Sequence, residues 1–307
     1  MSGNPRRQAT IGSLLVFGIT AIVGCSSAVS NGIGGDGAAS APTTEATTTT
    51  MAPPTTAAPT TVAPTTAAPT TEATTTTMPP PTTLPDVVEE VAPMAEPLRA
   101  IGRSSGGEAA RLQERLLELG FWVQSTDGDY GLTTQQAVMA FQKYMGFPDP
   151  SGSVDEQTAS ALNTETVRPH ARANSGTLVE VDKAKQVLFF VVDGRTEYIL
   201  NVSTGDGEPY TEPDQNTPGE IISGVSITPS GLHNVNRERP EGWWEGDLGQ
   251  IYRPKYFVGG VAVHGSNSIP NYPASHGCVR VSVPAMDWIW ESGIMPMKTP
   301  VWVHDGA

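Results

Sequence analysis

The order of apolar and polar positions divides the chain into stretches with different periods. Residues 11–24 are almost uniformly apolar, whereas residues 26–100 show no hydrophobic period at all. In residues 106–163 apolar side chains recur every three or four positions, which is typical of helices, and in residues 176–305 they recur every second position, which is typical of strands. The pattern therefore predicts a multi-domain chain: a small all-α module followed by a mainly-β domain.

Three helices are expected in the α module. The first begins near Glu108 and ends at Gly120, a residue type that stops helices. Thr133 with Gln136 three positions later predicts a capping box at the start of the second helix, and residues 154–162 supply a short third. The apolar stripes of the first two helices are Ala109, Leu112, Leu116 and Leu119, then Ala137, Val138, Phe141 and Met145.

The mainly-β domain is predicted to be a sandwich or barrel-like fold with one helix. Strands at 186–192 and 198–202 flank the dipeptide DG at 193–194, a strong hairpin signal. Further strands are predicted at 220–227, 257–264, 278–283 and 300–304. The single helix is expected over 284–293, from a proline to a glycine. Residues 229–254 lack a regular pattern, which favours a lid or substrate-facing excursion.

The first 24 residues read as a signal peptide. Arg6 and Arg7 precede an apolar stretch of 14 residues, too short for a membrane-spanning helix of roughly 20. The stretch ends in IVGC at Cys25 and resembles a bacterial lipobox, which implies cleavage before Cys25 and lipidation of its thiol. An ordinary secretory signal or an uncleaved anchor with an incidental cysteine stays open. We expect an exported protein, anchored through Cys25 to the outer face of the cytoplasmic membrane and reaching into the cell wall.

Composition explains the stretch that has no period. The chain of 307 residues is only 38% hydrophobic and 16% charged, and residues 42–85 alone contain 20 Thr and 10 Pro. Such a segment cannot bury a core, so residues 26–100 are predicted to form a disordered, Thr/Pro-rich linker.

The charge balance excludes one class of partner. With 18 basic and 32 acidic residues, the formal net charge is −14. Nucleic acid requires a basic surface that displaces counterions, and no Lys/Arg cluster here is longer than a pair. Binding to nucleic acid is therefore not expected.

The candidate chemistry lies in the second half of the chain. His264-Gly265 is followed, ten positions further on, by residues 275–280, SHGCVR, in which a cysteine comes two positions after a histidine. A thiolate is a nucleophile, and an imidazole can take its proton and return it to a leaving amine. Gly277 allows backbone N–H groups to approach an oxyanion. These residues predict cysteine acyl-transfer chemistry centred on Cys278.

The α module resembles the peptidoglycan-binding domain family over residues 106–163. The resemblance rests on Leu112-Gln113, Leu116, Leu119-Gly120-Phe121, the loop DGDYG at 127–131, Thr134, Ala137-Val138, Ala140-Phe141-Gln142, Asp155, Thr158 and Leu162. It implies a three-helix fold that recognises a cell-wall glycopeptide. A helical spacer that binds nothing is the alternative.

Residues 176–305 closely resemble the L,D-transpeptidases, whose catalytic domain is named after YkuD. The resemblance rests on the HG pair at 264–265 and SHGCVR at 275–280, with NTPG at 216–219 as a further match. It implies that Cys278 is the nucleophile, that His264 donates and accepts the proton, and that the Gly265 carbonyl orients the His264 ring. His276 is a weaker candidate. The 14 positions between His264 and Cys278 are slightly few for the family, which affects loop shape and acceptor preference.

The resemblance also implies the reaction. The cysteine attacks the carbonyl of the third residue, a diamino acid, in a peptidoglycan tetrapeptide stem and releases D-alanine. The side-chain amine of a neighbouring stem then resolves the thioester to a 3→3 crosslink, with no metal or other cofactor. Carbapenem-type β-lactams are the expected inhibitors. Two alternatives stay open: an L,D-carboxypeptidase that uses water as acceptor, and a non-catalytic lipoprotein that tethers the membrane to peptidoglycan.

Four further residues are candidates for substrate binding: Ser275, Arg280, Tyr256 and Trp243. Arg280 is equally well explained as a structural salt-bridge partner, and Tyr256 as a core residue. His264, His276 and Cys278 also form a possible three-ligand zinc set. His304 ends the last predicted strand and is expected to face solvent.

Overall fold

The computed structural model describes residues 88–215 and 217–306. The predicted signal peptide, Cys25 and most of the predicted linker lie outside these residues. Residues 88–100, assigned to the linker from sequence, are packed: Leu98 is buried, and Val91 N–H donates to the Thr166 carbonyl at 2.9 Å. In the part of the chain that the structure describes, no helix is long and apolar enough to cross a membrane.

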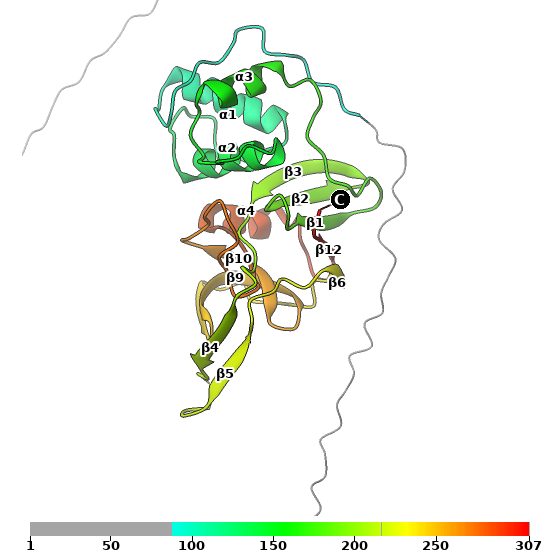
Figure 1. The fold of residues 1–307 in the computed structure, drawn as a ribbon. Coiled ribbons are helices and arrows are strands. Elements are labelled where there is room, and N and C mark those ends of the chain that lie inside the picture. The colour runs from blue at the N-terminus through cyan, green and yellow to red at the C-terminus, as the bar shows by residue number, and fades with distance from the viewer. Residues whose placement is uncertain (1–87, 216, 307) are drawn as a thin grey trace, which may run out of the picture. The chain divides into compact units, whose positions relative to one another are not determined.

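The three helices of the α module form as expected (Figure 1). They are α1 (Gly107–Glu118), α2 (Leu132–Tyr144) and α3 (Glu156–Thr164). Asp155 caps α3 by accepting the Thr158 N–H at 2.8 Å. The stripe residues Ala109, Leu112, Leu116, Leu119, Ala137, Val138 and Phe141 are all buried.

The predicted capping box is wrong. The cap position of α2 is Gly131, and no side chain caps the helix, so Thr133 lies inside the first turn. Gln136 does not turn back to the helix start. Its Oε1 accepts a hydrogen bond from Asn201 at 2.6 Å, and its Nε2 donates to the Ile269 carbonyl at 3.4 Å. Gln136 therefore holds the α module against the β domain.

The first sheet has the strand order β3-β2-β1-β12-β6. Its strands are β1 (Leu178–Asp182), β2 (Val187–Val192), β3 (Arg195–Asn201), β6 (Gly231–Asn234) and β12 (Pro300–His304). The β2–β3 hairpin turns at Asp193 and Gly194, both with positive φ (49° and 82°), as the DG signal predicts. β1 and β12 run parallel, which brings the end of the chain next to the start of the domain.

The second sheet has the order β11-β10-β9-β7, with β8 also paired to β9. Its strands are β7 (Arg237–Glu238), β8 (Trp243–Gly246), β9 (Gly249–Val258), β10 (Val261–Ser266) and β11 (Val279–Ser282). A separate hairpin consists of β4 (Pro209–Pro213) and β5 (Ile221–Val225). Much of the segment 229–254 is therefore strand, and its expected irregularity is wrong: β7 and β8 both pair with the nearby β9, and β6 pairs with the distant β12.

The one helix of the β domain is α4 (Val283–Ser292). Ser282 caps it by accepting the Ala285 N–H at 3.3 Å, and Gly293 ends it in the left-handed conformation with φ 65°. The fold class predicted from the sequence, a helical module followed by a mainly-β domain with one helix, is confirmed.

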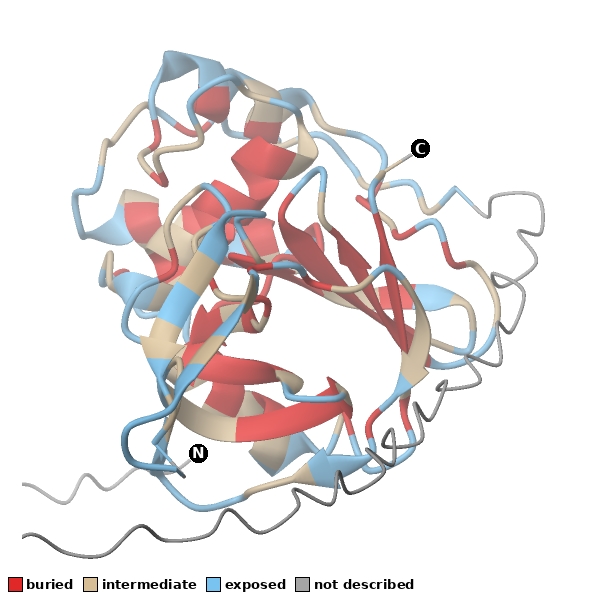
Figure 2. Cartoon of the chain, turned by 60° about the horizontal axis from the view of Figure 1, so that its bottom comes forward, coloured by how far each residue is buried: buried red, intermediate tan, exposed pale blue. Residues whose placement is uncertain are grey.

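Buried side chains form two clusters, and the first one spans both predicted domains. Figure 2 shows buried residues in helices as well as in strands. It joins the helix stripes to residues of the first sheet such as Phe189 and Ile199. The main chain does the same, because Trp122 N–H donates to the Ile199 carbonyl at 3.1 Å and Ile199 N–H donates to the Gly120 carbonyl at 2.8 Å. The α module is thus packed onto the β domain and shares its core.

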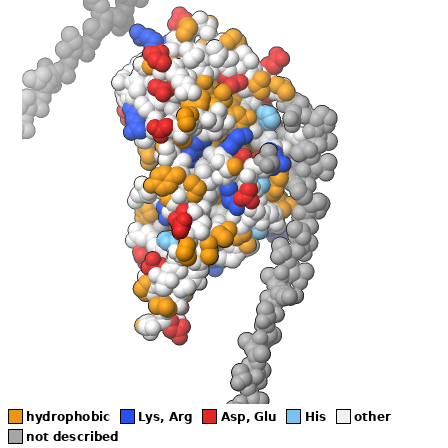
Figure 3. Space-filling view, in the orientation of Figure 1, with side chains coloured by type: hydrophobic (Ala, Val, Ile, Leu, Met, Phe, Trp, Pro, Cys, Tyr) orange, Lys and Arg blue, Asp and Glu red, His pale blue; other side chains and the backbone are white. Residues whose placement is uncertain are grey.

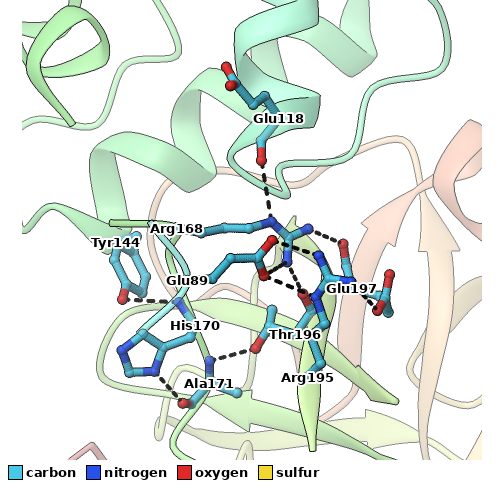
Figure 4. Close-up of polar contacts among 9 residues, drawn as sticks. All are labelled: Glu89, Glu118, Tyr144, Arg168, His170, Ala171, Arg195, Thr196 and Glu197. Carbon is cyan, nitrogen blue, oxygen red and sulfur yellow. Dashed lines mark hydrogen bonds and ion pairs between the residues drawn. The ribbon is translucent and has the colours of Figure 1, made fainter. Parts of the chain in front are cut away.

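Arg168 reinforces this junction (Figure 4). Its guanidinium is buried and donates to the backbone carbonyls of Glu118 at the end of α1 and of Thr196 and Glu197 on β3. Glu89 lies 3.7 Å away and also binds Arg195 at 2.6 Å. One side chain therefore connects the segment before α1, the helices and the first sheet.

The prediction for His304 is wrong. The side chain is buried, and its Nε2 lies 3.1 Å from Glu180 Oε1. Glu180 is fully buried too, and its carboxylate accepts the N–H groups of Arg172 and Ala173 at 2.9 and 2.7 Å. The pairing of β1 with β12 places the two side chains together, and sequence alone does not reveal that pairing.

Lys143 on α2 is buried where the α module packs against the β domain. Its Nζ donates to the carbonyls of Val202 at 3.0 Å and Gln186 at 3.3 Å. Burial lowers the pKa of this amine from 10.5 to about 7. The unfolded chain therefore binds more protons than the folded one between pH 7 and 10.5, so this group makes stability rise with pH in that window. Below about pH 7 the amine is charged in both the folded and the unfolded chain, so the free energy of unfolding is lowered by the full cost of burying that charge.

We expect Lys143→Met to weaken this pH dependence. The increase in Tm of the wild type between pH 7 and pH 10 should shrink in the variant, because methionine does not titrate. Thermal unfolding followed by circular dichroism at a series of pH values measures this. Lys298→Met, at an exposed lysine, serves as control and should keep the wild-type slope; an unchanged slope in Lys143→Met would contradict the assignment.

Candidate active site

The candidate catalytic residues belong to two neighbouring parallel strands: His264 lies on β10, and Cys278 directly precedes β11. The register of β10 and β11 pairs His264 with Arg280, and Cys278 precedes Arg280 by two positions. Because side chains alternate along a strand, Cys278 and Arg280 project to one face, while Val279 and Val281 enter the core. His264, Cys278 and Arg280 all line one cavity of about 490 Å³. Strand pairing thus brings a thiol and an imidazole 14 positions apart to the same face.

The His264 ring has a defined orientation. Its Nδ1 lies 2.8 Å from the Gly265 carbonyl oxygen, and since a carbonyl only accepts, Nδ1 carries the proton and Nε2 keeps a lone pair. Burial lowers the pKa of His264 to about 4; the bond to Gly265 opposes this shift, and the charge of Arg280 adds to it. Near neutral pH the ring is therefore neutral and can accept a proton at Nε2.

Cys278 is partly buried, and its Sγ lies 3.8 Å from the Gly260 carbonyl oxygen. Burial raises the pKa of the thiol, and the Ala262 N–H and the Arg280 charge offset this only in part. The thiol is therefore protonated at neutral pH and needs a base before it can attack. A neutral imidazole on the same face meets that need.

Hydrogen bonds from the Ser275 and Thr228 side chains fix the turn before β11. The Ser275 hydroxyl donates to the Cys278 carbonyl and accepts the Gly277 N–H at 3.1 Å. The Gly277 carbonyl accepts from Thr228 Oγ1 at 2.6 Å. Gly277 has φ +127°, and a Cβ there would lie 2.7 Å from the Ile227 carbonyl oxygen. Only glycine fits this position, which presents Cys278 to the cavity.

Two hairpins form the far walls of the cavity. Tyr210, Ile222 and Val225 come from β4 and β5, and residues 244 and 246–251 come from β8, β9 and the turn between them. The hairpins meet where Gln215 N–H donates to Asp247 Oδ1 at 2.9 Å. Ile221, at the start of β5, is 70% exposed, and Figure 3 shows hydrophobic side chains on the hairpin that projects at the bottom of the view.

Comparison with known proteins agrees with this site. The model of the L,D-transpeptidase catalytic domain (YkuD) matches residues 176–303, and the model of a peptidoglycan binding domain matches residues 105–162. The crystal structure of the L,D-transpeptidase (residues 123–326) from Xylanimonas cellulosilytica is 46% identical, with a TM-score of 0.60, over 69% of this chain and 100% of that one. This chain belongs to the L,D-transpeptidase family.

Other solved L,D-transpeptidases match less closely. The structure from Stackebrandtia nassauensis is 20% identical over 69% of this chain and 98% of that one, with a TM-score of 0.37. The one from Mycobacterium smegmatis is 19% identical over 42% of this chain and 58% of that one, with a TM-score of 0.31. No curated protein matches the chain.

Most residues singled out from the L,D-transpeptidase motif line the cavity. His264, Ser275, His276, Cys278, Arg280 and Tyr256 do so. The His276 ring meets Tyr210 edge-on, with centroids 5.5 Å apart. The Ser275 hydroxyl is occupied within the turn, and Tyr256 is buried beneath the Arg237 guanidinium, 3.9 Å from the ring centroid. Both are thus part of the scaffold as well as of the wall.

Trp243 does not line this cavity. It packs on Tyr252 with ring centroids 5.2 Å apart, and its neighbour Trp244 takes the place in the wall. Tyr210 and Arg237 line the cavity too, although no motif in the sequence marks them. Alternation along β8 would have distinguished the two tryptophans, but that strand was not predicted.

Two alternative interpretations can be compared with the structure: a zinc site formed by His264, His276 and Cys278, and a structural salt bridge formed by Arg280. Across the described residues, no group of three His, Cys, Asp or Glu side chains is arranged to hold a metal ion. Within those residues no carboxylate forms an ion pair with Arg280, although Asp206 is near enough to raise its pKa against the lowering effect of burial. A structural salt bridge therefore does not explain Arg280.

Gly277→Ala should both destabilise the L,D-transpeptidase domain and reduce the reactivity of Cys278. The new Cβ collides with the Ile227 carbonyl at a backbone angle that alanine tolerates poorly, so we expect a loss of about 1–3 kcal/mol. Gly207→Ala is the matched control, because Gly207 also has positive φ (+82°) but no atom within 4 Å of the added Cβ. Chemical denaturation and the rate of iodoacetamide alkylation measure both effects; equal losses in the two variants would refute the collision.

Proposed function

We propose that this chain is a cell-wall L,D-transpeptidase that forms 3→3 peptidoglycan crosslinks through a thioester on Cys278. The observation that carries the proposal is the shared cavity face of the thiol and of a neutral imidazole whose Nε2 is free to accept a proton. The family membership and the peptidoglycan-binding module indicate the substrate class.

The first half of the reaction uses the thiol and His264. Nε2 of His264 takes the thiol proton, and the sulfur attacks the carbonyl of the third residue of a tetrapeptide stem. The Gly277 N–H is already bound to Ser275, so the Cys278 N–H is the donor we assign to the oxyanion. When the C–N bond breaks, the imidazolium returns the proton to the departing amine of D-alanine, and the acyl group stays on sulfur.

The second half repeats these steps with another nucleophile. The side-chain amine of a diamino acid from a neighbouring stem gives its proton to His264 and attacks the thioester, and the thiol is restored as the amide forms. We assign the guanidinium of Arg280, which has no ion-pair partner among the described residues, to a carboxylate of the substrate. Tyr256 and His276 form walls of the same cavity. Carbapenem-type β-lactams are the expected inhibitors, because their strained carbonyl acylates the same sulfur.

Incubation of the purified chain with a disaccharide-tetrapeptide tests the proposal. Mass spectrometry should detect released D-alanine, an acyl adduct on the Cys278 peptide and crosslinked dimers. Cys278→Ala should abolish all three, and His264→Gln should slow D-alanine release by about 10²–10⁴-fold. His170→Gln, outside the cavity, is the matched control.

The products also separate the alternatives. Tripeptide without dimer would identify an L,D-carboxypeptidase. Retention on sacculi with neither adduct nor released D-alanine would identify a non-catalytic tether. Substantial D-alanine release by Cys278→Ala would overturn the nucleophile assignment.

We further propose that Cys25 carries a lipid and that residues 26–87 act as a spacer between membrane and wall. The two domain families imply a protein that acts on the cell wall, and the lipobox-like IVGC supports an anchor. Cys25→Ala should shift the protein from the membrane fraction to the soluble exported fraction, measured by immunoblotting. Unchanged membrane retention would mean that residues 11–24 anchor the chain themselves.

A further inference from the structure

A second hollow of about 490 Å³ adjoins the candidate active site. Its lining is a continuous stretch, residues 238–244. Trp244 lines both this hollow and the cavity that contains Cys278. The two spaces are therefore neighbours that share one indole as their common wall.

Trp243 and Trp244 are unusually exposed for their type, at 43% each. Trp122 and Trp302, in contrast, are 6% exposed. Large aromatic surfaces left open next to a cavity are characteristic of ligand-binding grooves. Each indole is nevertheless held in place: Trp243 packs on Tyr252, and the Arg239 guanidinium lies 3.5 Å from the ring centroid of Trp244.

The loop that forms the hollow is also fixed. Arg253 N–H donates to the Gly242 carbonyl at 3.0 Å, and Arg253 Nε donates to the Pro240 carbonyl at 2.8 Å. The same guanidinium binds Asp287 on α4 at 2.6 Å. A ligand would therefore meet a preformed surface and would not have to order it, which favours affinity.

The charges around the hollow point to a neutral, hydroxyl-rich ligand. Arg239 and Glu241 lie on its rim with opposite signs, and Glu238 is already paired with Lys255 at 2.8 Å. A polyanion or a polycation would meet a like charge here. A carbohydrate fits, because its C–H faces stack on indoles and its hydroxyls bond to both carboxylate and guanidinium.

We propose that the hollow between residues 238 and 244 is a subsite for the glycan part of peptidoglycan. The inference rests on the proposed function, in which a stem peptide occupies the cavity with its reacting carbonyl at Cys278. The sugar is covalently joined to that peptide and must leave the cavity through a neighbouring opening. Trp244 lines both spaces, and Trp243 also lines the hollow.

Steady-state kinetics with and without the sugar test the subsite. For the wild type, kcat/KM for D-alanine release should be at least tenfold higher with disaccharide-tetrapeptide than with free tetrapeptide. Trp244→Ala should lose most of this ratio, mainly through KM, and Trp243→Ala a smaller part. Trp244→Phe keeps an aromatic face and should retain most of it, and Met297→Ala, at a residue that is also 43% exposed, should retain all of it.

Two kinetic outcomes would overturn the subsite. One is a wild-type ratio near one, because the sugar then adds nothing to recognition. The other is an equal loss on both substrates in Trp244→Ala, because the indole then contacts only the peptide.

A binding measurement separates failure of the subsite from failure of the proposed chemistry. Tryptophan fluorescence of the Cys278→Ala chain is titrated with β-1,4-linked N-acetylglucosamine oligomers. A saturable change that Trp244→Ala weakens at least tenfold supports the subsite even if no D-alanine is ever released. If the wild type releases D-alanine but the saccharide causes no fluorescence change in the Cys278→Ala chain, the proposed chemistry stands and the subsite is refuted.

Discussion

The candidate site depends on one interaction, the parallel pairing of β10 with β11 in the register that sets His264 opposite Arg280. That register is maintained by the turn before β11, where Gly277 passes against the Ile227 carbonyl and Ser275 and Thr228 bind the turn's peptide groups. A shift of one residue would send Cys278 to the core face and Val279 to the cavity. Burial then adjusts the chemistry, because it keeps the imidazole neutral and the thiol protonated.

The shared core gives the α module a structural role in the candidate site. The Val202 carbonyl that binds Lys143 is followed by Ser203, which pairs with the backbone of Arg280 in both directions. Thr204 comes next, and its carbonyl accepts the N–H groups of Ala274 and Ser275. The junction between the helices and the first sheet is thus connected by short covalent and hydrogen-bonded steps to the turn that carries Cys278. The helices that resemble a peptidoglycan-binding domain and the L,D-transpeptidase domain are therefore parts of one packed body.

Local patterns predicted the local features well. The turn at Asp193-Gly194 needs two residues with positive φ, and the stop at Gly293 needs one, so residue type alone indicates both. Predictions failed where a distant partner decided the outcome. The Gln136 side chain accepts a hydrogen bond from Asn201 and does not form the predicted capping box. The His304 side chain is buried against Glu180, which lies on another strand. The strands in 229–254 were missed for a different reason: β7 and β8 have only two and four residues, too few to show a period, although both pair with the nearby β9.

For this protein the sequence by itself determined the fold class and the family resemblance and singled out Cys278 and His264 as candidates, because these rest on periodicity and on residue types at fixed spacing. Only the tertiary structure decided that Trp244 and not Trp243 enters the wall of the cavity, that Arg280 lacks an ion-pair partner among the described residues, and that the α module shares a core with the β domain. The physical reason is that burial, charge pairing and cavity lining are properties of segments brought together from distant positions, and a linear pattern does not contain those contacts.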